Sequence, residues 1–536
     1  MPVNQLAARI RPALSRAASG PAFWIALSIS AVAGCALVSI ALGGDANWDL
    51  KNYHLYAALA DHTGNDHHPA GIQSHLNPTL DLLLTRPLLE HGSLLLLSAV
   101  LGGLQGLNFV VLTAIAYQLL RGDDDRTLLA LLAAFLGLTG AIVVAEIGTT
   151  LGDLTTALLV LGAFFCCLRA LSDDGRSAVS RWTALGGFAI GIAVGLKLGN
   201  AVFLVALVGA MLLAGGARRL RAALLVAFAA ACAIALVQGW WSWRVWQAFG
   251  NPVFPFFNGV FQSPFYPSMS FRDLRFMPRS WPQALFYPFY FCCNHQTAEV
   301  AFRDYRFPIA FALAAMLPFA AWSTPSGATI RSRGILLLTA FVVLSYVVWE
   351  AVFSIARYAI VLELLLPTFS LIVLLRLSPR HGRLVFVAVA LALALTTRPA
   401  DWGRLDAATA SRPIVDDVLL DRLGSMLDGA AVVLGPLPLA YLAGILRDRD
   451  IAWIGPDFTP ADARVAAAKL ARRPRAFAIA RASPADLESV DRRLRALGLP
   501  GIDATRCSEF ATTLDEKLAL CEVDAGAARP ATLSNR

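Results

Sequence analysis

The chain has 536 residues, of which 57% are hydrophobic and 15% charged, and its formal net charge is +8. A soluble domain carries about 25% charged residues, so this composition excludes an ordinary soluble protein. The positive charge does not indicate a nucleic-acid partner. The part after residue 396 holds equal numbers of basic and acidic side chains, so the excess lies among the apolar runs, as expected for the cytoplasmic loops of a membrane protein.

Apolar runs in the first 396 residues predict about eleven membrane-spanning helices. The expected spans are Ala22–Leu42, Leu94–Leu120, Leu128–Ala145, Leu154–Leu168, Trp182–Leu196, Ala201–Leu213, Ala222–Trp240, Phe307–Trp322, Ile335–Trp349, Tyr358–Leu375 and Leu384–Leu395. Several are shorter than the ~20 residues that cross a bilayer, so some pairs could equally be short hairpins or tilted neighbours. We expect no cleaved leader, because the first apolar run is long and no small-residue cleavage site follows it.

The distribution of Lys and Arg predicts the orientation of the chain in the membrane. If the N-terminus is inside, every inner loop is basic. The outer loop 43–93 then contains only two basic residues, Lys51 and Arg86. The long loop after Trp240 has arginines of its own, but long loops count for less. We therefore expect a multi-pass protein of the inner (plasma) membrane. Its parts would be a cytoplasmic N-terminus 1–21, a transmembrane domain 22–396 with outer loops 43–93 and 241–306, and an outer domain 397–536.

The last part of the chain alternates short apolar runs with helical stretches, which predicts a small α/β domain. The apolar runs are Ala431–Gly435, Ile451–Gly455 and Ala476–Ala480, and the helical stretches are Asp416–Leu427, Pro460–Ala471 and Pro484–Leu497. No dinucleotide or phosphate-loop glycine pattern is present in this part. The predicted fold class is an all-α polytopic membrane protein with a small C-terminal α/β domain outside.

Two cysteines of this domain, Cys507 and Cys521, flank the stretch SEFATTLDEKLAL, which is typical of a strand, a turn and a strand. A hairpin would bring them opposite one another, and an oxidising space would then favour a disulfide. The alternative is two unpaired cysteines on different strands. The sequence has no CxxC motif and no Cys/His spacing of a metal site.

The first candidate site is the stretch GGDANWDLKNYHLYAALA, which follows the first apolar run directly. It contains Asp45 and Asp49, with Lys51 and His54 just behind them. Ionisable residues at a membrane edge indicate function by default. The alternative is that both aspartates only cap the helix that follows.

A second outer turn, AEIGTTLGDLTTALLVL, places Glu146 and Asp153 at the mouths of adjacent spans, where they could share a metal or a substrate. Lys197 is the single lysine of an apolar hairpin, GFAIGIAVGLKLGNAVFLVAL. It could extend to the membrane interface or neutralise a lipid phosphate. The aromatic-rich loop 250–307 could likewise line a substrate cleft or form an aromatic belt.

The order of these elements resembles the GT-C superfamily of integral-membrane glycosyltransferases, which use polyprenyl-phosphate sugars. The resemblance covers residues 22–375 and rests on five motifs in order. They are an Asp after the first span, Asp153 heading a later one, GLKLGNAVFL, WWSWRVWQAFGNPVFPFFN and SIARYAIVLELLLP. The first loop departs from the pattern because it has no adjacent Asp-Glu or Asp-x-Asp pair. This departure leaves open which aspartate is catalytic and whether a metal is bound.

The resemblance implies inverting transfer of a sugar from a polyprenyl-phosphate donor to a hydroxyl of a glycan, lipid or protein acceptor, on the outer face of the bilayer. Asp49 would be the general base with Asp45 beside it, because a carboxylate must take the hydroxyl proton. Glu146 and Asp153 would position the substrate or hold a divalent ion, Mg or Mn. The cations expected at the departing phosphate are Lys197, Arg303, Arg306 and Arg357. The alternatives are a lipid or glycolipid transporter or flippase and a non-catalytic membrane scaffold.

Overall fold

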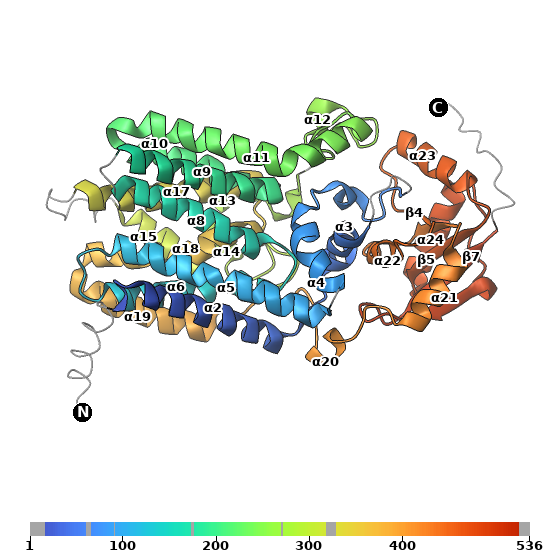
Figure 1. The fold of residues 1–536 in the computed structure, drawn as a ribbon, viewed down its shortest axis with the longest axis horizontal. Coiled ribbons are helices and arrows are strands. Elements are labelled where there is room, and N and C mark those ends of the chain that lie inside the picture. The colour runs from blue at the N-terminus through green and yellow to red at the C-terminus, as the bar shows by residue number, and fades with distance from the viewer. Residues whose placement is uncertain are drawn as a thin grey trace. The chain divides into compact units, whose positions relative to one another are not determined.

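The structure is a computed structural model that describes residues 17–60, 66–90, 92–172, 176–269, 272–317 and 329–524. The expected cytoplasmic N-terminus lies largely outside these residues, as does the end of the expected span Phe307–Trp322. The chain forms two compact units (Figure 1). The helical unit comprises Met1–Ser39, Ala99–Gln238 and Arg272–Trp402, and the mixed unit comprises Ile40–Ser98, Gly239–Phe271 and Gly403–Arg536.

The predicted fold class, a helical membrane protein with a small C-terminal α/β domain, is confirmed, and the placement of that domain outside stays a prediction. Among the described residues, eight helices are long and apolar enough to cross a membrane, and three shorter apolar helices accompany them. The long helices are α2 (Pro21–Leu42), α5 (Leu94–Leu119), α8 (Asp153–Ser172), α9 (Arg176–Leu196), α11 (Arg219–Phe249), α17 (Thr329–Val352), α18 (Ile360–Leu377) and α19 (Pro379–Thr396). The shorter ones are α6 (Arg126–Leu138), α10 (Ala201–Ala214) and α15 (Arg306–Ala315).

Short elements connect these helices in the helical unit. They are α7 (Ala141–Glu146), η4 (Leu198–Asn200), η5 (Gly216–Arg218), η6 (Leu274–Phe276), α13 (Trp281–Leu285), α14 (Tyr287–Phe291) and η7 (Ala356–Ala359). One expected span, Leu128–Ala145, is broken in two, because the backbone is extended at Gly140 between α6 and α7. The break turns the segment that carries Glu146 into a separate short helix.

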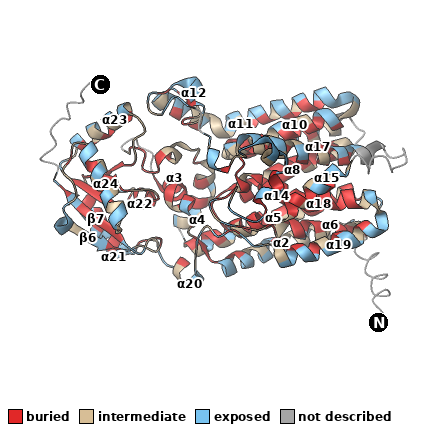
Figure 2. Ribbon diagram, turned by 180° about the vertical axis from the view of Figure 1, so that it is seen from behind, coloured by how far each residue is buried: buried red, intermediate tan, exposed pale blue. Residues whose placement is uncertain are grey.

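Helix α18 forms the centre of the helical unit. Every residue from Ile360 to Leu374 is buried, and the helix packs against α6, α15, α17 and α19 (Figure 2). A helix that is apolar on nearly all sides lies either in a protein core or in the lipid of a membrane. The sequence of α18 is of this kind, and the helices around it present their more exposed faces outward.

The mixed unit contains a five-stranded sheet in the order β4-β3-β5-β7-β6. Its strands are β3 (Ala431–Leu434), β4 (Ala452–Ile454), β5 (Ala476–Arg481), β6 (Cys507–Phe510) and β7 (Leu518–Val523). Strand β3 is parallel to β4 and β5, whereas β7 is antiparallel to β5 and β6. The helices of this domain are α20 (Ala407–Ala410), α21 (Asp417–Leu427), α22 (Tyr441–Ile445), α23 (Pro460–Ala471), α24 (Pro484–Ala496) and η8 (Ala504–Arg506). The three predicted apolar runs and three predicted helical stretches form β3, β4, β5, α21, α23 and α24.

The first loop, residues 43–93, is part of the same core as the C-terminal domain. Its elements are β1 (Gly44–Asp45), η1 (Leu50–His54), α3 (Leu55–Leu59), η2 (Gly71–His75), η3 (Asp81–Thr85) and α4 (Arg86–Glu90). Helix α3 packs against α22, and Leu50 and Leu55 share one buried cluster with Leu434 and Trp453. Strand β1 pairs with β2 (Arg404–Leu405), and Lys51 Nζ lies 3.0 Å from Asp515 Oδ1. The mixed unit also contains α12 (Asn258–Phe261).

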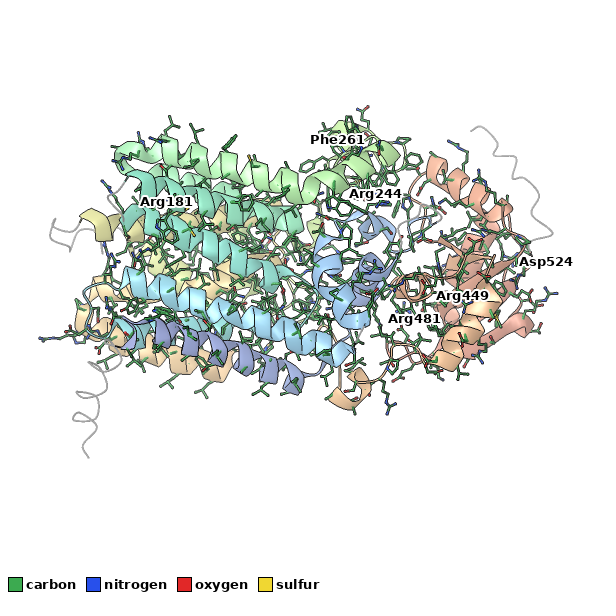
Figure 3. The ribbon with its side chains drawn as sticks, viewed as in Figure 1. Arg181, Arg244, Phe261, Arg449, Arg481 and Asp524 are labelled. Atoms are coloured by element: carbon green, nitrogen blue, oxygen red, sulfur yellow. A yellow bond between two sulfur atoms is a disulfide. The ribbon has the colours of Figure 1, made fainter. Side chains whose placement is uncertain are left out.

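The basic and acidic residues of the C-terminal domain are equal in number, and many of its arginines form ion pairs with aspartates on the surface. Arg481 Nε lies 2.8 Å from Asp486 Oδ2, and Arg449 Nη2 lies 3.6 Å from Asp421 Oδ1. Arg449 and Arg481 are labelled in Figure 3. Such exposed pairs contribute about 0–1 kcal/mol each, so they serve solubility more than stability.

Cys507 and Cys521 stand directly opposite one another on β6 and β7, and their sulfur atoms are bonded. We predict that replacing both by serine lowers the unfolding free energy of the mixed unit by about 3 kcal/mol, because the disulfide closes a loop of roughly fifteen residues. Denaturant unfolding in detergent, followed by tryptophan fluorescence, measures this loss. Cys232→Ser, at an exposed free cysteine, is the control. Free thiols at both positions in protein from the native membrane would contradict the prediction.

Candidate functional site

Asp45, the first candidate, is fixed in a tight turn of the mixed unit. It is fully buried in strand β1, where it lies opposite Arg404 of the antiparallel strand β2. Its Oδ1 accepts hydrogen bonds from the backbone N and the Nδ2 of Asn47 at 3.1 and 2.6 Å. Its own backbone N donates to Ser98 Oγ at 3.0 Å. These bonds fix the path of the chain as it leaves α2.

Asp49 precedes η1 and is buried, with 8% of its surface exposed. Its Oδ2 accepts a hydrogen bond from Tyr53 Oη at 3.1 Å, but its side chain makes no capping bond to the helix. Asn47 has that role, because its Oδ1 accepts from Leu50 N at 2.8 Å. Asn is among the best capping residues. The sequence therefore indicated Asn47 as a possible cap, but the capping alternative considered only the two aspartates.

The second candidate cluster lies in the helical unit, at the start of α8. Lys197 Nζ lies 2.6 Å from Asp153 Oδ2 and 2.6 Å from Leu151 O. Glu146, at the end of α7, accepts a hydrogen bond from Leu154 N through Oε2 at 3.0 Å. Within the described part of the chain, its other oxygen is buried without a hydrogen-bond partner. The two carboxylates and the lysine therefore meet at one helix N-terminus.

The charge state of this cluster follows from burial. Glu146 is completely buried, and α7 lies outside the long apolar helices. Burial raises the pKa of Glu146 well above its ordinary value, the negative charge of Asp153 raises it further, and Lys197 lowers it in part. Burial thus favours the neutral form of Glu146, and Asp153 is the carboxylate that pairs with Lys197.

Arg357 joins this cluster through Tyr358. The ring of Tyr358 has Lys197 Nζ 5.5 Å from its centroid and Arg357 Cζ 5.3 Å from it. Cations at this distance are attracted to the face of an aromatic ring. The structure thus brings together four of the residues singled out in the sequence, namely Glu146, Asp153, Lys197 and Arg357.

Arg303 and Arg306, the other expected phosphate ligands, have structural partners instead. Arg306 is 2% exposed, and its guanidinium donates to Leu136 O, Thr139 Oγ1, Thr397 Oγ1 and Asp304. A buried arginine needs all its N–H donors satisfied, and these bonds leave none directed to a lipid phosphate. Arg303 is half-buried, and its Nε donates to Thr396 O at 2.8 Å.

Two carboxylates that the sequence analysis did not single out hold α7 in place. Asp304 Oδ2 accepts from Ala141 N at 2.9 Å, and Glu363 accepts from Ile142 N at 3.2 Å and Val143 N at 3.0 Å. Gly140 makes room for them, because a Cβ there would lie 2.4 Å from Cδ of Glu363. A lone glutamate in an otherwise apolar span was the available signal.

An apolar cavity of about 360 Å³ opens between helices of the helical unit. Its walls come from α13, α14, α15, α17 and α18, and almost all of its lining is aliphatic or aromatic. Tyr346 and Glu350 of α17 are its polar members. A cavity of this kind suits an apolar ligand.

Comparison with known proteins bears on this arrangement. Residues 104–215, from within α5 to the end of α10, match the family described as dolichyl-phosphate-mannose-protein mannosyltransferase. No curated protein matches the chain in sequence. Two solved structures are similar to it, both of ArnT from Cupriavidus metallidurans. The one bound to undecaprenyl phosphate has 13% identity and a TM-score of 0.52 and covers 95% of this chain and 100% of that one. The apo form has 15% identity and a TM-score of 0.52 and covers 95% and 99%.

The chain shares the fold of these ArnT structures. The family match extends over residues 104–215 and agrees with the expected membrane glycosyltransferase. The matched segment contains Glu146, Asp153 and Lys197, so the cluster at α8 belongs to the part of the chain with recognisable sequence similarity.

We predict that Lys197→Ala destabilises the helical unit, because it leaves the charge of Asp153 buried without its cation. The expected loss is about 2 kcal/mol, less than for a fully buried pair because the lysine is partly exposed. The double variant Lys197→Ala, Asp153→Asn should recover most of this stability. Thermal unfolding in detergent is the measurement, and equal melting temperatures of the single and double variants would contradict the prediction.

Proposed function

We propose that the protein transfers a sugar from a polyprenyl-phosphate donor to an acceptor hydroxyl, with inversion at the anomeric carbon, on the outer face of the membrane. The observation that carries the proposal is the cationic pair Lys197 and Arg357 around Tyr358, within a GT-C fold. A similar protein, ArnT, has been crystallised with undecaprenyl phosphate. The fold and the family match favour an enzyme over a flippase or a scaffold.

The proposed role of Lys197 and Arg357 is to bind the phosphate of the donor. Negative charge grows on this phosphate as the sugar departs, so fixed cations stabilise the transition state. An ammonium group has three N–H donors, and Leu151 O and Asp153 take two of those of Lys197. The third is directed to the donor phosphate, and the planar fork of Arg357 supplies two parallel bonds.

The proposed place of the lipid chain is the apolar cavity of the helical unit. Isoprenoid groups gain about 25 cal/mol for each Å² of apolar surface that they bury. The cavity walls offer such surface from α15, α17 and α18. A volume of about 360 Å³ holds only part of a polyprenyl chain, and the remainder would lie in the bilayer.

For the general base we propose Asp49, with Asp45 as its positioning residue. A base must come within hydrogen-bond reach of the acceptor hydroxyl. Asp45 has no exposed surface and holds Asn47 with its Oδ1, whereas Asp49 is 8% exposed. Asp49 is therefore the better placed of the two to meet a substrate.

A divalent Mg or Mn ion at Glu146 and Asp153 does not fit the geometry of the cluster. Hard cations are held in proteins mainly by ionised carboxylates, with carbonyl oxygens and water completing the shell. Asp153 is already neutralised by Lys197, and burial favours the neutral form of Glu146. We therefore propose that these two residues orient Lys197, and we derive no step through a metal.

We predict that Asp49→Asn abolishes sugar transfer, with a loss of about 10²–10⁴-fold from removing the base. The assay uses purified full-length protein and a panel of radiolabelled polyprenyl-phosphate hexoses and pentoses. Binding of undecaprenyl phosphate should be unchanged, which separates loss of the base from misfolding. Asp45→Asn should reduce transfer less. The reverse order of the two variants would make Asp45 the base.

A further prediction concerns the affinity for the lipid phosphate. Lys197→Ala, Asp153→Asn, the variant that restores stability, should bind undecaprenyl phosphate about 10-fold more weakly than wild type, a change of ~1.4 kcal/mol. Asp153→Asn alone keeps the cation and should bind at least as tightly as wild type. Microscale thermophoresis in detergent measures both affinities. Unchanged binding by the double variant would show that Lys197 does not bind the donor phosphate.

A further inference from the structure

Three histidines of the first loop, His67, His68 and His75, lie together in the mixed unit and have no part in the proposed chemistry. The backbone of His67 runs along strand β4 as an extra edge: its N donates to Trp453 O, and its O accepts from Gly455 N, both at 2.7 Å. Gly455 is needed there, because a Cβ would lie 1.8 Å from His68 O. The C-terminal domain therefore fixes these histidines in position.

Two aspartates of the C-terminal domain face the same histidines. Asp462 Oδ1 lies 2.8 Å from His68 Nε2 and 3.3 Å from His67 Nε2, and Asp457 Oδ1 lies 3.1 Å from His67 Nε2. His67, His68 and Asp462 are all buried, and their ligand atoms lie within 4.8 Å of one another. Adjacent ligand atoms around a tetrahedral zinc ion are about 3.3 Å apart, given Zn–N and Zn–O bonds of roughly 2.0–2.1 Å. The ligand atoms of His67, His68 and Asp462 are thus close enough to share one zinc ion, and Asp457 Oδ1 lies beside them at His67.

The surrounding hydrogen bonds hold these groups in the orientation that a metal requires. His68 Nδ1 lies 2.6 Å from His75 Nε2, so its N–H can donate to His75 while Nε2 points at the cluster. Asp462 Oδ2 accepts from Phe458 N at 2.9 Å, which leaves Oδ1 for the cluster. The other carboxylate oxygen of Asp457, Oδ2, lies 3.5 Å from Arg493 Nη2. Metal-binding histidines and carboxylates usually have outer partners of this kind.

The shell beyond these partners is aromatic. Phe458 lies 5.5 Å from His68 between ring centroids, and Phe249 and Phe254 lie 4.6 and 5.3 Å from His75. Trp241 Nε1 donates to His75 O at 2.8 Å and so holds that part of the loop. Apolar surroundings limit the access of water and strengthen the attraction between a cation and its carboxylate ligands.

We propose that His67, His68 and Asp462 bind a zinc ion that joins the first loop to the C-terminal domain, with Asp457 held beside His67. Two imidazoles and one carboxylate are suitable zinc ligands, and a water molecule would complete the tetrahedral shell. The ion would act as a cross-link between segments that are distant in the chain. The proposal stands on the mixed unit alone and does not depend on the proposed transferase activity.

The rival is a network of N–H···O hydrogen bonds among the same atoms, with no metal. Full-length protein, purified from membranes without added metal, distinguishes the two. We expect about one zinc ion per chain by elemental analysis, and a shell of N and O atoms at about 2.0 Å in X-ray absorption spectra. A strong chelator should lower the melting temperature, and added zinc should restore it.

The decisive variant is His67→Gln, because a glutamine N–H can still donate to Asp457 but binds zinc poorly. We expect the zinc content to fall at least about 10-fold and the sensitivity to chelator to disappear. His295→Gln, at an exposed histidine of the helical unit, is the matched control and should keep the ion. Wild-type protein without zinc, or zinc retained by His67→Gln, would overturn the proposal. Stoichiometric binding of a different metal would overturn the assignment to zinc.

Discussion

The helical unit depends on how three charged side chains are accommodated in its interior. Asp304 and Glu363 accept the first N–H groups of α7, and Arg306 pairs with Asp304 while bonding to the end of α6. Each group alone would cost several kcal/mol to bury, but together they satisfy one another. These hydrogen bonds fix the position of α7. Because Glu146 ends α7, they also fix Glu146 beside Asp153 and Lys197. The candidate phosphate site therefore rests on charges that never touch a substrate.

The sequence was informative wherever local pattern decides structure. Apolar length predicted the membrane helices, and alternating short runs predicted β3, β4 and β5 in the C-terminal domain. The break at Gly140 was not predictable from hydropathy, because it depends on Glu363, more than two hundred residues away. The same is true of Arg306, whose partners on α6 and beside α19 come from distant parts of the chain.

The candidate functional residues also divide into those that the local sequence could identify and those that depend on distant parts of the chain. Asp153, Lys197 and Arg357 could be singled out because isolated charges next to apolar spans are conspicuous. The histidines of the first loop could not be assigned as ligands, because their carboxylate partners lie about four hundred positions away and form no recognisable spacing. The two segments are brought together by the tertiary fold, which includes the shared core of Leu50, Leu55 and Trp453.

That shared core has a consequence for how the protein is made. The first loop emerges early in synthesis, but helix α22, which packs against the helix of Leu55 and Tyr56, comes nearly four hundred residues later. At about 5–20 residues per second, the loop waits roughly 20–80 s with apolar surface exposed. Contacts of such long separation also form slowly. A chaperone that shields the loop in this interval would therefore set the yield of folded protein.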